Sequence, residues 1–355
     1  MTATYQIPTA HAFDVTFRST PVDPKKIHAI VPTYNDWEGL LVTLNSLQRI
    51  NPSPPNITIV NDNISSTVPE WLTMSLKDPR LNLINCDGNC GPAYARNLGF
   101  GFPATYTSRG LMTPICSASQ NDPKVRRQHR DDPRLKPDHP LKPTEFTWHH
   151  DIHWFYFTDC GCEHDPNLFV EFEEEWQNVG DSCVAISGPV NGAADGRINA
   201  FMTKQAILSP PKEKIIYDRL LPQAIVTANA LISGVALSYV GGFDETFNEA
   251  AGEDLDLGLR LRPLGVIGWA ERAIVRHRFR EDQSDFYNRF KRYGRGNRHL
   301  ELKHNLPSLR ARRFKAELPE FQELADLSVK AMQEGYDEAV DPHNRGKITI
   351  TNPDS

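Results

Sequence analysis

Short apolar runs alternate with helical patterns along the first hundred residues of the chain. Three runs of strand length lie at residues 27–31, 57–60 and 81–84. Leu40, Leu44 and Leu47 follow the first run at helical spacing, and Asn35 with Glu38 resembles the capping box that starts a helix. Strands that alternate with helices predict a mainly parallel sheet covered by helices on both faces.

The same pattern resumes in the second half of the chain. An aromatic run at residues 154–157 predicts a buried central strand, and residues 184–186 predict another. Residues 254–264 have the pattern of a helix that ends at proline and glycine, and residues 273–279 alternate like a strand. The C-terminal part is charged and helical in pattern. The chain as a whole therefore predicts an α/β fold with a helical C-terminal extension.

Residues 104–150 interrupt this order. The stretch from residue 123 to residue 143 is rich in Pro, Arg, Lys and Asp and has almost no large apolar side chains. We therefore expect an exposed, flexible loop. It is either a lid or acceptor clamp, or a solvated insertion, and its composition favours the second interpretation.

Composition narrows the class of protein. The 355 residues carry a formal net charge of −6, with 39% hydrophobic and 24% charged residues, which gives no reason to expect nucleic acid as a partner. The sequence has neither an apolar run of membrane-spanning length nor the pattern of a secretory signal. Its six cysteines suit a reducing compartment. We expect a cytoplasmic protein with small, soluble partners, and self-association into a homo-oligomer stays open.

Polar motifs follow the predicted strands, and their order carries a resemblance. Residues 31–35 (Val-Pro-Thr-Tyr-Asn) and 60–63 (Val-Asn-Asp-Asn) come first, followed by residues 89–99, 157–161, 241–245 and 252–257. In this order the motifs resemble those of inverting family-2 glycosyltransferases. The resemblance implies the GT-A (Rossmann-like) fold, which is a mixed, mainly parallel sheet flanked by helices.

The resemblance also divides the chain into segments. It implies an N-terminal arm over residues 1–25, the nucleotide-binding half of a GT-A domain over residues 26–103, the insertion over residues 104–150, the metal and acceptor half over residues 151–282, and a C-terminal basic loop with helices over residues 283–355. It implies an enzyme that moves a sugar from a nucleotide-diphosphate donor, a UDP-sugar above all, to a hydroxyl of a soluble acceptor. The alternatives are a non-catalytic sugar-nucleotide-binding protein and a sugar-phosphate nucleotidyltransferase.

The resemblance assigns a donor site to the first three motifs. The carboxylate of Asp62 accepts a hydrogen bond from the N–H of a uracil-like base in this assignment. Arg96 lies nearby and meets the base or a phosphate. The other implied donor-binding residues are Pro32, Thr33, Tyr34, Asn89, Asp159, Arg292 and Arg295. The alternative for Asp62 is a turn residue after a strand, and for Arg96 it is a surface charge.

A divalent cation, Mn²⁺ or Mg²⁺, is implied by the position of Asp159. The family's Asp-x-Asp motif falls there, but Gly161 stands in place of the second Asp. The resemblance implies Asp159 and His277 as the metal ligands, supplemented by Glu163, Asp165 or water.

A zinc site is a separate alternative to that cation. Cys160, Cys162 and His164 alternate, so an extended chain would place all three side chains on one face. A fourth ligand is not evident in the sequence. Packed thiols are the preferred interpretation.

The acceptor side is implied by the last two motifs. The resemblance assigns the general base to Asp254, with Glu253 as a second catalytic residue that binds or orients the acceptor, beside Gly242 and Phe243. The alternative is that these acids complement the dipole at the start of a helix.

The basic stretch at residues 289–299 surrounds Gly294 and Gly296. We interpret it as a flexible loop that closes on the pyrophosphate through Arg292 and Arg295 and excludes water. The alternative is a solvated basic face.

Overall fold

The computed structural model describes residues 17–339 except residues 64, 87, 106–152, 194, 211 and 217–218. Residues 106–150 of the predicted insertion (residues 104–150) and residues 1–16 of the predicted N-terminal arm (residues 1–25) therefore lie outside the described residues.

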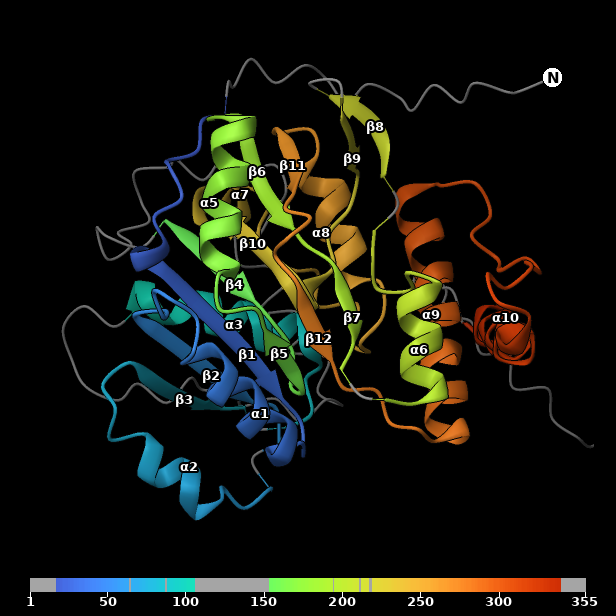
Figure 1. The fold of residues 1–355 in the computed structure, drawn as a ribbon, viewed down its shortest axis with the longest axis horizontal. Helices are drawn as coiled ribbons and strands as arrows, with labels where there is room; N and C mark the ends of the chain where they lie inside the picture. The colour runs from blue at the N-terminus through green and yellow to red at the C-terminus, as the bar shows by residue number, and fades with distance from the viewer. Residues whose placement is uncertain are drawn as a thin grey trace, which may run out of the picture.

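A seven-stranded mixed sheet forms the centre of the molecule, in the order β11-β6-β10-β4-β1-β2-β3 (Figure 1). The strands are β1 (Ile27–Thr33), β2 (Asn56–Asn61), β3 (Leu81–Asn85), β4 (Trp154–Phe157), β6 (Cys183–Ser187), β10 (Ala230–Ser233) and β11 (Val266–Trp269). Only β10 runs antiparallel to its neighbours in this sheet. The predicted mainly parallel sheet is confirmed.

Two smaller sheets lie beside the central one. The first has the order β5-β12-β7, with β5 (Cys162–His164), β12 (Val275–His277) and β7 (Val190–Gly192). The second pairs β8 (Lys212–Ile216) with β9 (Arg219–Pro222). Because β5 follows β4 directly, the first small sheet extends the carboxyl edge of the central strands toward His277.

Helices cover both faces of the central sheet, and further helices lie beyond its edge. They are α1 (Trp37–Leu47), α2 (Glu70–Ser75), α3 (Pro92–Thr105), α5 (Leu168–Val179), α6 (Arg197–Lys204), α7 (Gly234–Tyr239), α8 (Glu253–Leu261), α9 (Gln283–His304) and α10 (Gln322–Glu338). Short 3₁₀ turns lie at Pro24–Lys26, Thr227–Asn229 and Pro319–Phe321. None of the helices in the described residues is both long and apolar enough to cross a bilayer.

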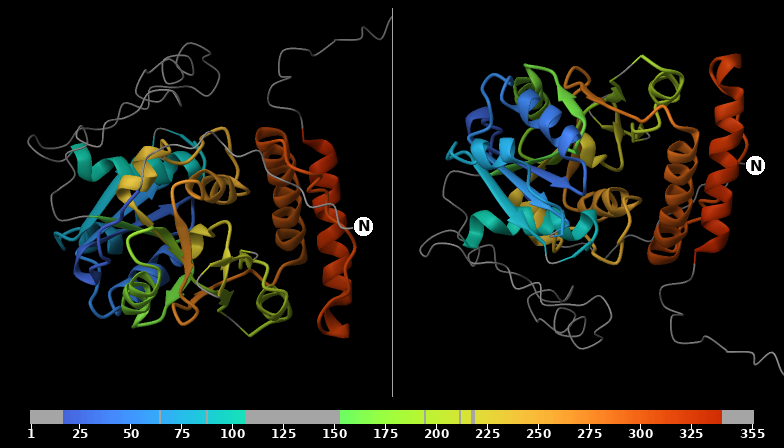
Figure 2. Two further views of the ribbon diagram at one scale, coloured as in Figure 1. Left: turned by 90° about the horizontal axis from the view of Figure 1, so that it is seen from above. Right: turned by 90° about the horizontal axis from the view of Figure 1, so that it is seen from below.

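The alternation of side chains along β4 separates two hydrophobic cores. Trp154 and Tyr156 pack with α1 and α5 on one face, whereas Phe155 and Phe157 pack with α3, α7 and α8 on the other. The predicted central aromatic strand is therefore confirmed. Helices α9 and α10 lie side by side beyond one edge of this layered body (Figure 2).

The start of α1 corrects the predicted capping box. Asp36, not Asn35, is the N-cap, and its carboxylate accepts a hydrogen bond from the Gly39 N–H at 2.9 Å. Asn35 takes a left-handed conformation with φ 56°, and its side chain accepts from Asn63 instead. The helix therefore begins one residue later than the predicted capping box implies.

The predicted flexible basic loop at residues 289–299 is wrong, because this stretch lies inside the 22-residue helix α9. A side chain at Gly294 would collide with the carbonyl oxygen of Met332 on α10. A side chain at Gly296 would lie 2.5 Å from the carbonyl oxygen of Ala251. The two glycines therefore allow close packing of α9, and they do not make the chain flexible.

Candidate active site

The carboxyl ends of β1 and β2 hold the first cluster of predicted residues. The Asp62 N–H donates to the Thr33 carbonyl, and its carboxylate accepts from the N–H groups of Cys90 and Gly91 at 2.9 and 2.8 Å. Asp62 is 4% exposed, and burial raises the pKa of its carboxyl above the ordinary value. In this structure Asp62 therefore holds the turn from which α3 begins. The hydrogen bond of Asp62 to a nucleoside base stays a prediction.

The surroundings of Asp62 are partly open to solvent. Tyr34 is 50% exposed and Asn89 is exposed, whereas Thr33 is buried and Pro32 half-buried. An aromatic ring at the end of a central strand, open on one side, can stack on a nucleoside base. The predicted nucleoside-binding residues are thus brought to one edge of the sheet.

Arg96 on α3 joins the two halves of the site. Its Nη1 donates to Glu253 Oε1 and its Nη2 to Asp159 Oδ1, both at 2.8 Å. The guanidinium carbon lies 5.7 Å from the centre of the Phe243 ring. Burial opposes the charge of Arg96, but Asp159 and Glu253 outweigh it and raise the pKa of the guanidinium above its ordinary value. Arg96 is 3% exposed, so the surface-charge interpretation is wrong.

The two acids that open α8 differ in accessibility. Glu253 is 4% exposed, and burial together with the charge of Asp254 raises its pKa to about 7. Its Oε2 is buried and has no hydrogen-bond partner among the described residues. Asp254 is half-buried, and burial raises the pKa of its carboxyl against the opposing charge of Arg96. Asp254 is thus the more accessible of two carboxylates with increased proton affinity.

The backbone fixes the Asp254 carboxylate. It accepts from the Leu255 N–H at 2.8 Å and from the Thr227 N–H at 3.3 Å. These bonds stabilise the ionised form, so the carboxylate is held by α8 and by the turn before β10. Asp256 faces elsewhere, because it is fully buried and bonds Arg260 and His304.

Asp159 and His277 lie within electrostatic range of each other. Burial lowers the pKa of His277, and the charge of Asp159 opposes that shift. The His277 Nδ1 lies 3.1 Å from the Arg278 carbonyl oxygen, which can only accept, so Nδ1 carries the proton and Nε2 keeps its lone pair. The side chain of Asp159 is 32% exposed beside its bond to Arg96. One carboxylate and one imidazole can therefore contribute ligands to a divalent cation.

The supplementary metal ligands are occupied by other partners. Glu163 pairs with Arg278 at 2.8 Å, and Asp165 accepts from the Asn167 N–H. Within the described ranges, no three His, Cys, Asp or Glu side chains are grouped so that they could hold a metal ion. Any cation would therefore rely on Asp159 and His277, together with oxygen atoms of a ligand.

The zinc alternative does not fit the position of His164. Its Nδ1 bonds to Ser46 Oγ at 2.9 Å and its Nε2 to Thr158 Oγ1 at 3.0 Å. Both ring nitrogens are therefore used inside the protein. Cys162 is fully buried, and burial raises the pKa of its thiol to about 12. Packing is thus the correct interpretation of this alternating stretch.

The loop before α8 holds the two residues predicted to contact the acceptor beside Glu253, Gly242 and Phe243. Phe243 is 3% exposed and packs edge-on against Phe157, with ring centres 5.2 Å apart. Gly242 takes φ 75°, and a Cβ there would lie 2.6 Å from Asn97 Oδ1. Both residues therefore serve the packing of the loop, and their contact with an acceptor stays a prediction.

Helix α9 places only part of the predicted basic set near the site. Arg295 pairs with Glu249 at 2.8 Å. The Nε of Arg292 is buried and has no hydrogen-bond partner in the described part of the chain. Arg289 lies over the Phe279 ring, and its charge lowers the pKa of His277 after the larger effect of burial. Residues 289 and 292 are three positions apart, which on a helix places them on one face. This spacing could have indicated Arg289 as a neighbour of Arg292 near the site.

Electrostatic contacts thus connect the residues predicted to converge. Arg96 interacts with Asp159, Glu253 and Asp254, and Asp159 interacts with His277. Asp62 joins this group through the start of α3, the helix that carries Arg96.

Two family models match the chain on both sides of its central insertion. "Glycosyl transferase family 2" matches residues 28–102, and "Glycosyl transferase family group 2" matches residues 213–333, which together make up more than half of the chain. The chain belongs to the family 2 glycosyltransferases. It is therefore a glycosyltransferase, which argues against the nucleotidyltransferase alternative.

One solved structure shows that this glycosyltransferase has the GT-A fold. The mannosyltransferase PcManGT from Pyrobaculum calidifontis, in complex with GDP-Man and Mn²⁺, is 13% identical, with a TM-score of 0.50 over 91% of this chain and 77% of that one. TarS from S. aureus is 12% identical, with a TM-score of 0.45 over 88% of this chain and 44% of its own. This glycosyltransferase thus spans less than half of TarS. No curated protein matches the chain.

Proposed function

We propose that this glycosyltransferase moves a sugar from a UDP-sugar to a hydroxyl of a small soluble acceptor, with inversion and with Asp254 as the general base. The observation that carries the proposal is the contrast between Asp254 and Glu253. Arg96 holds the buried Glu253, whereas the half-buried Asp254 lies within its charge range and has a raised carboxyl pKa. A base must be reachable by the acceptor, and Asp254 meets that condition better.

The donor would bind along the carboxyl edge of β1 and β2. Tyr34 offers an exposed ring for the base, and Asp62 secures the turn that contains Asn89 and the start of α3. Arg292 brings an unpaired buried Nε from α9, which suits an anionic group of the donor. Arg295 is a weaker candidate because Glu249 already neutralises it.

The residues Asp159 and His277 fit a divalent cation, Mn²⁺ or Mg²⁺. The fit rests on the fixed tautomer of His277, whose Nε2 lone pair is available, and on the part-exposed Asp159 carboxylate. Such a cation supplies positive charge that stabilises the departing diphosphate.

The transfer step balances with Asp254 alone as proton acceptor. The acceptor oxygen forms its bond to the anomeric carbon while the bond from that carbon to the diphosphate oxygen breaks. Asp254 takes the hydroxyl proton, and the electron pair leaves with the nucleoside diphosphate. Attack from the face opposite the leaving group inverts the anomeric centre. Arg96 holds the carboxylates of Asp159 and Glu253 in place through one hydrogen bond to each.

Replacing the base tests the proposal. We expect Asp254→Asn to lower the rate of nucleoside diphosphate release by about 10²- to 10⁴-fold, because the amide cannot accept the proton. The rate is measured with a panel of UDP- and GDP-sugars, with Mn²⁺ and with EDTA. EDTA should suppress the wild-type rate, and an unchanged rate would remove the metal from the proposal.

The matched control is Asp337→Asn, which changes an exposed carboxylate on α10 that pairs with Arg310. This variant should keep the wild-type rate. If Asp254→Asn also stays within about twofold of the wild type, Asp254 is not the base. The acceptor, the cytoplasmic location and the oligomeric state stay predictions.

A further inference from the structure

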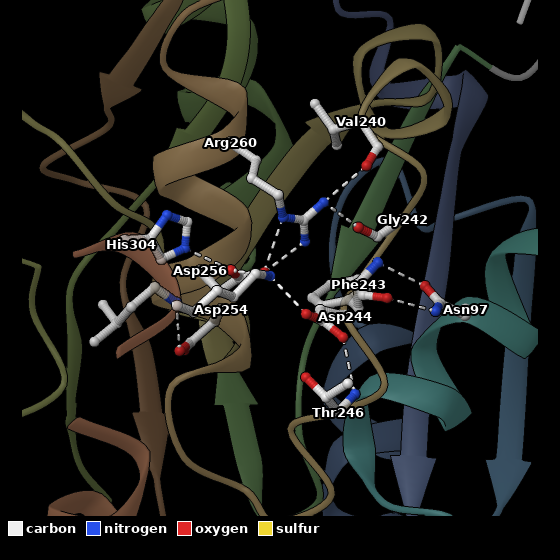
Figure 3. A network of polar contacts seen from close by, with 12 residues as sticks. Asn97, Val240, Gly242, Phe243, Asp244, Thr246, Asp254, Asp256, Arg260 and His304 are labelled. Atoms are coloured by element: carbon white, nitrogen blue, oxygen red, sulfur yellow. Dashed lines mark hydrogen bonds and ion pairs between the residues drawn. The ribbon is translucent and has the colours of Figure 1, made fainter. Parts of the chain in front are cut away.

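The side chain of Asn97 pairs with a peptide unit of the loop before α8 (Figure 3). Its Oδ1 accepts from the Phe243 N–H at 2.7 Å, and its Nδ2 donates to the Phe243 carbonyl and to Glu245 Oε1, both at 2.9 Å. The amide thus bonds both polar groups of one backbone residue, as a neighbouring strand would. Both of its N–H donors are used.

The loop is shaped to receive this amide. Gly242 takes φ 75°, and a Cβ at this position would lie 2.6 Å from Asn97 Oδ1. On the other side, Arg260 Nη1 donates to the carbonyls of Val240 and Gly242 at 2.8 and 2.7 Å (Figure 3). Two helices therefore hold the loop by its backbone, α8 through Arg260 and α3 through Asn97.

The residue held by Asn97 packs against the centre of the site. The Phe243 ring contacts Phe157 edge-on and lies 5.7 Å from the guanidinium carbon of Arg96. Arg96 in turn bonds Asp159 and Glu253. Arg96 and Asn97 are neighbours on α3, so one helical turn contacts the carboxylates of Asp159 and Glu253 and also the loop that packs on Arg96.

We propose that Asn97 is a positioning residue for sugar transfer, which fixes Phe243 against Arg96 and so holds Arg96 between Asp159 and Glu253. The inference rests on the proposed function. It adds a residue that touches neither donor nor acceptor and acts through the loop. A side-chain amide suits this role because it offers a donor and an acceptor at the spacing of a peptide group.

The first test removes the amide. We expect Asn97→Ala to lower kcat for nucleoside diphosphate release by about 10- to 100-fold, because a displacement of about 1 Å at a reacting group has an effect of that size. The donor KM should stay within about threefold, since Asn97 bonds Phe243 and Glu245, neither of which is a predicted donor-binding residue. Asn297→Ala is the matched control, because its amide donates to the Leu309 carbonyl instead. It should retain the wild-type kcat.

The second test separates positioning from a general loss of structure. Asn97→Asp keeps the acceptor for the Phe243 N–H but faces the Phe243 carbonyl and the Glu245 carboxylate with a negative charge. Its kcat should fall at least as far as that of Asn97→Ala. Adding Glu245→Gln supplies an N–H donor opposite the introduced carboxylate, so the double variant should recover kcat several-fold. Glu245→Gln alone should stay close to the wild type.

Each outcome decides between the hypotheses. Wild-type kcat in Asn97→Ala, or a loss found only in donor KM, overturns the positioning role while the wild-type turnover still supports the proposed function. Failure of Glu245→Gln to rescue Asn97→Asp also counts against it. If the wild type releases nucleoside diphosphate from none of the UDP- and GDP-sugars, the proposed function fails and the inference fails with it.

Discussion

At the scale of single residues, Arg96 is the cation on which the candidate site depends. It is 3% exposed and bonds two carboxylates that come from different parts of the chain, Asp159 after β4 and Glu253 at the start of α8. A buried cation loses its hydration, and only close, well-directed partners compensate for that loss. The charges of Asp159 and Glu253 are in turn stabilised by the guanidinium of Arg96.

We therefore expect Arg96→Met to lower the free energy of unfolding by about 3–5 kcal/mol, because it leaves buried carboxylates without a counter-charge. The comparison is Arg310→Met, which removes an exposed ion pair with Asp337 and should cost less than about 1 kcal/mol. Urea denaturation of both variants measures the difference. Equal losses would show that the Arg96 network does not stabilise the fold.

At the scale of elements, α9 and α10 are packed through glycines. A Cβ at Gly294 on α9 would collide with the Met332 carbonyl, and one at Gly335 on α10 would collide with the Lys291 carbonyl. Each glycine therefore lets the backbone of the opposite helix approach. This packing holds the half of α9 that carries Arg289 and Arg292 alongside the site.

Gly294→Ala should destabilise the protein by about 1–3 kcal/mol, because the added methyl group forces the two helices apart. Gly101→Ala on α3 is the control, since a Cβ there meets no atom within 4 Å. It should be neutral or stabilise by about 0.5–1 kcal/mol, because alanine favours a helix over glycine. Thermal unfolding compares the two variants, and a Gly294→Ala protein as stable as the wild type would contradict the packing argument.

At the scale of the whole molecule, the buried ring of His164 connects the central sheet to its surroundings. It bonds Ser46 on α1 and Thr158 at the end of β4, and it lies on β5 of the small sheet. Burial lowers the pKa of His164 to about 3. The ring therefore stays neutral in the folded protein at pH values where it is protonated in the unfolded chain.

This difference predicts that the protein becomes less stable as the pH falls below about 6.5, the ordinary pKa of histidine. From there down to about 3 the unfolded state binds a proton that the folded state does not. The free energy of unfolding should fall by about 1.4 kcal/mol per pH unit from this group. Denaturation midpoints of the wild type and His164→Asn between pH 7 and pH 5 test it. Parallel profiles would contradict the assignment.

The order of strands and helices could be predicted from the sequence, because hydrophobic periodicity is a local property. The alternation along β4, the helix that begins at Glu253 and the buried face of β12 all follow from spacing within one segment. The acidic motif at Asp254 and the donor-side carboxylate Asp159 were assigned by the resemblance to family-2 glycosyltransferases, and their roles stay predictions. Each is recognisable without knowledge of its spatial neighbours.

Only the tertiary structure decided what these residues touch. Arg96 and Glu253 are 157 positions apart, and nothing local in the sequence pairs them. Distant partners likewise decide the hydrogen bonds of Asn97 to the Phe243 backbone, the use of Asp62 at the start of α3 and the packing of the helix over residues 289–299. Gly294 and Gly296 suggest a flexible loop when the sequence is considered alone. In the structure they allow other parts of the backbone to pack closely against α9. Local pattern determines which elements form, whereas the side chains that meet between those elements determine the site.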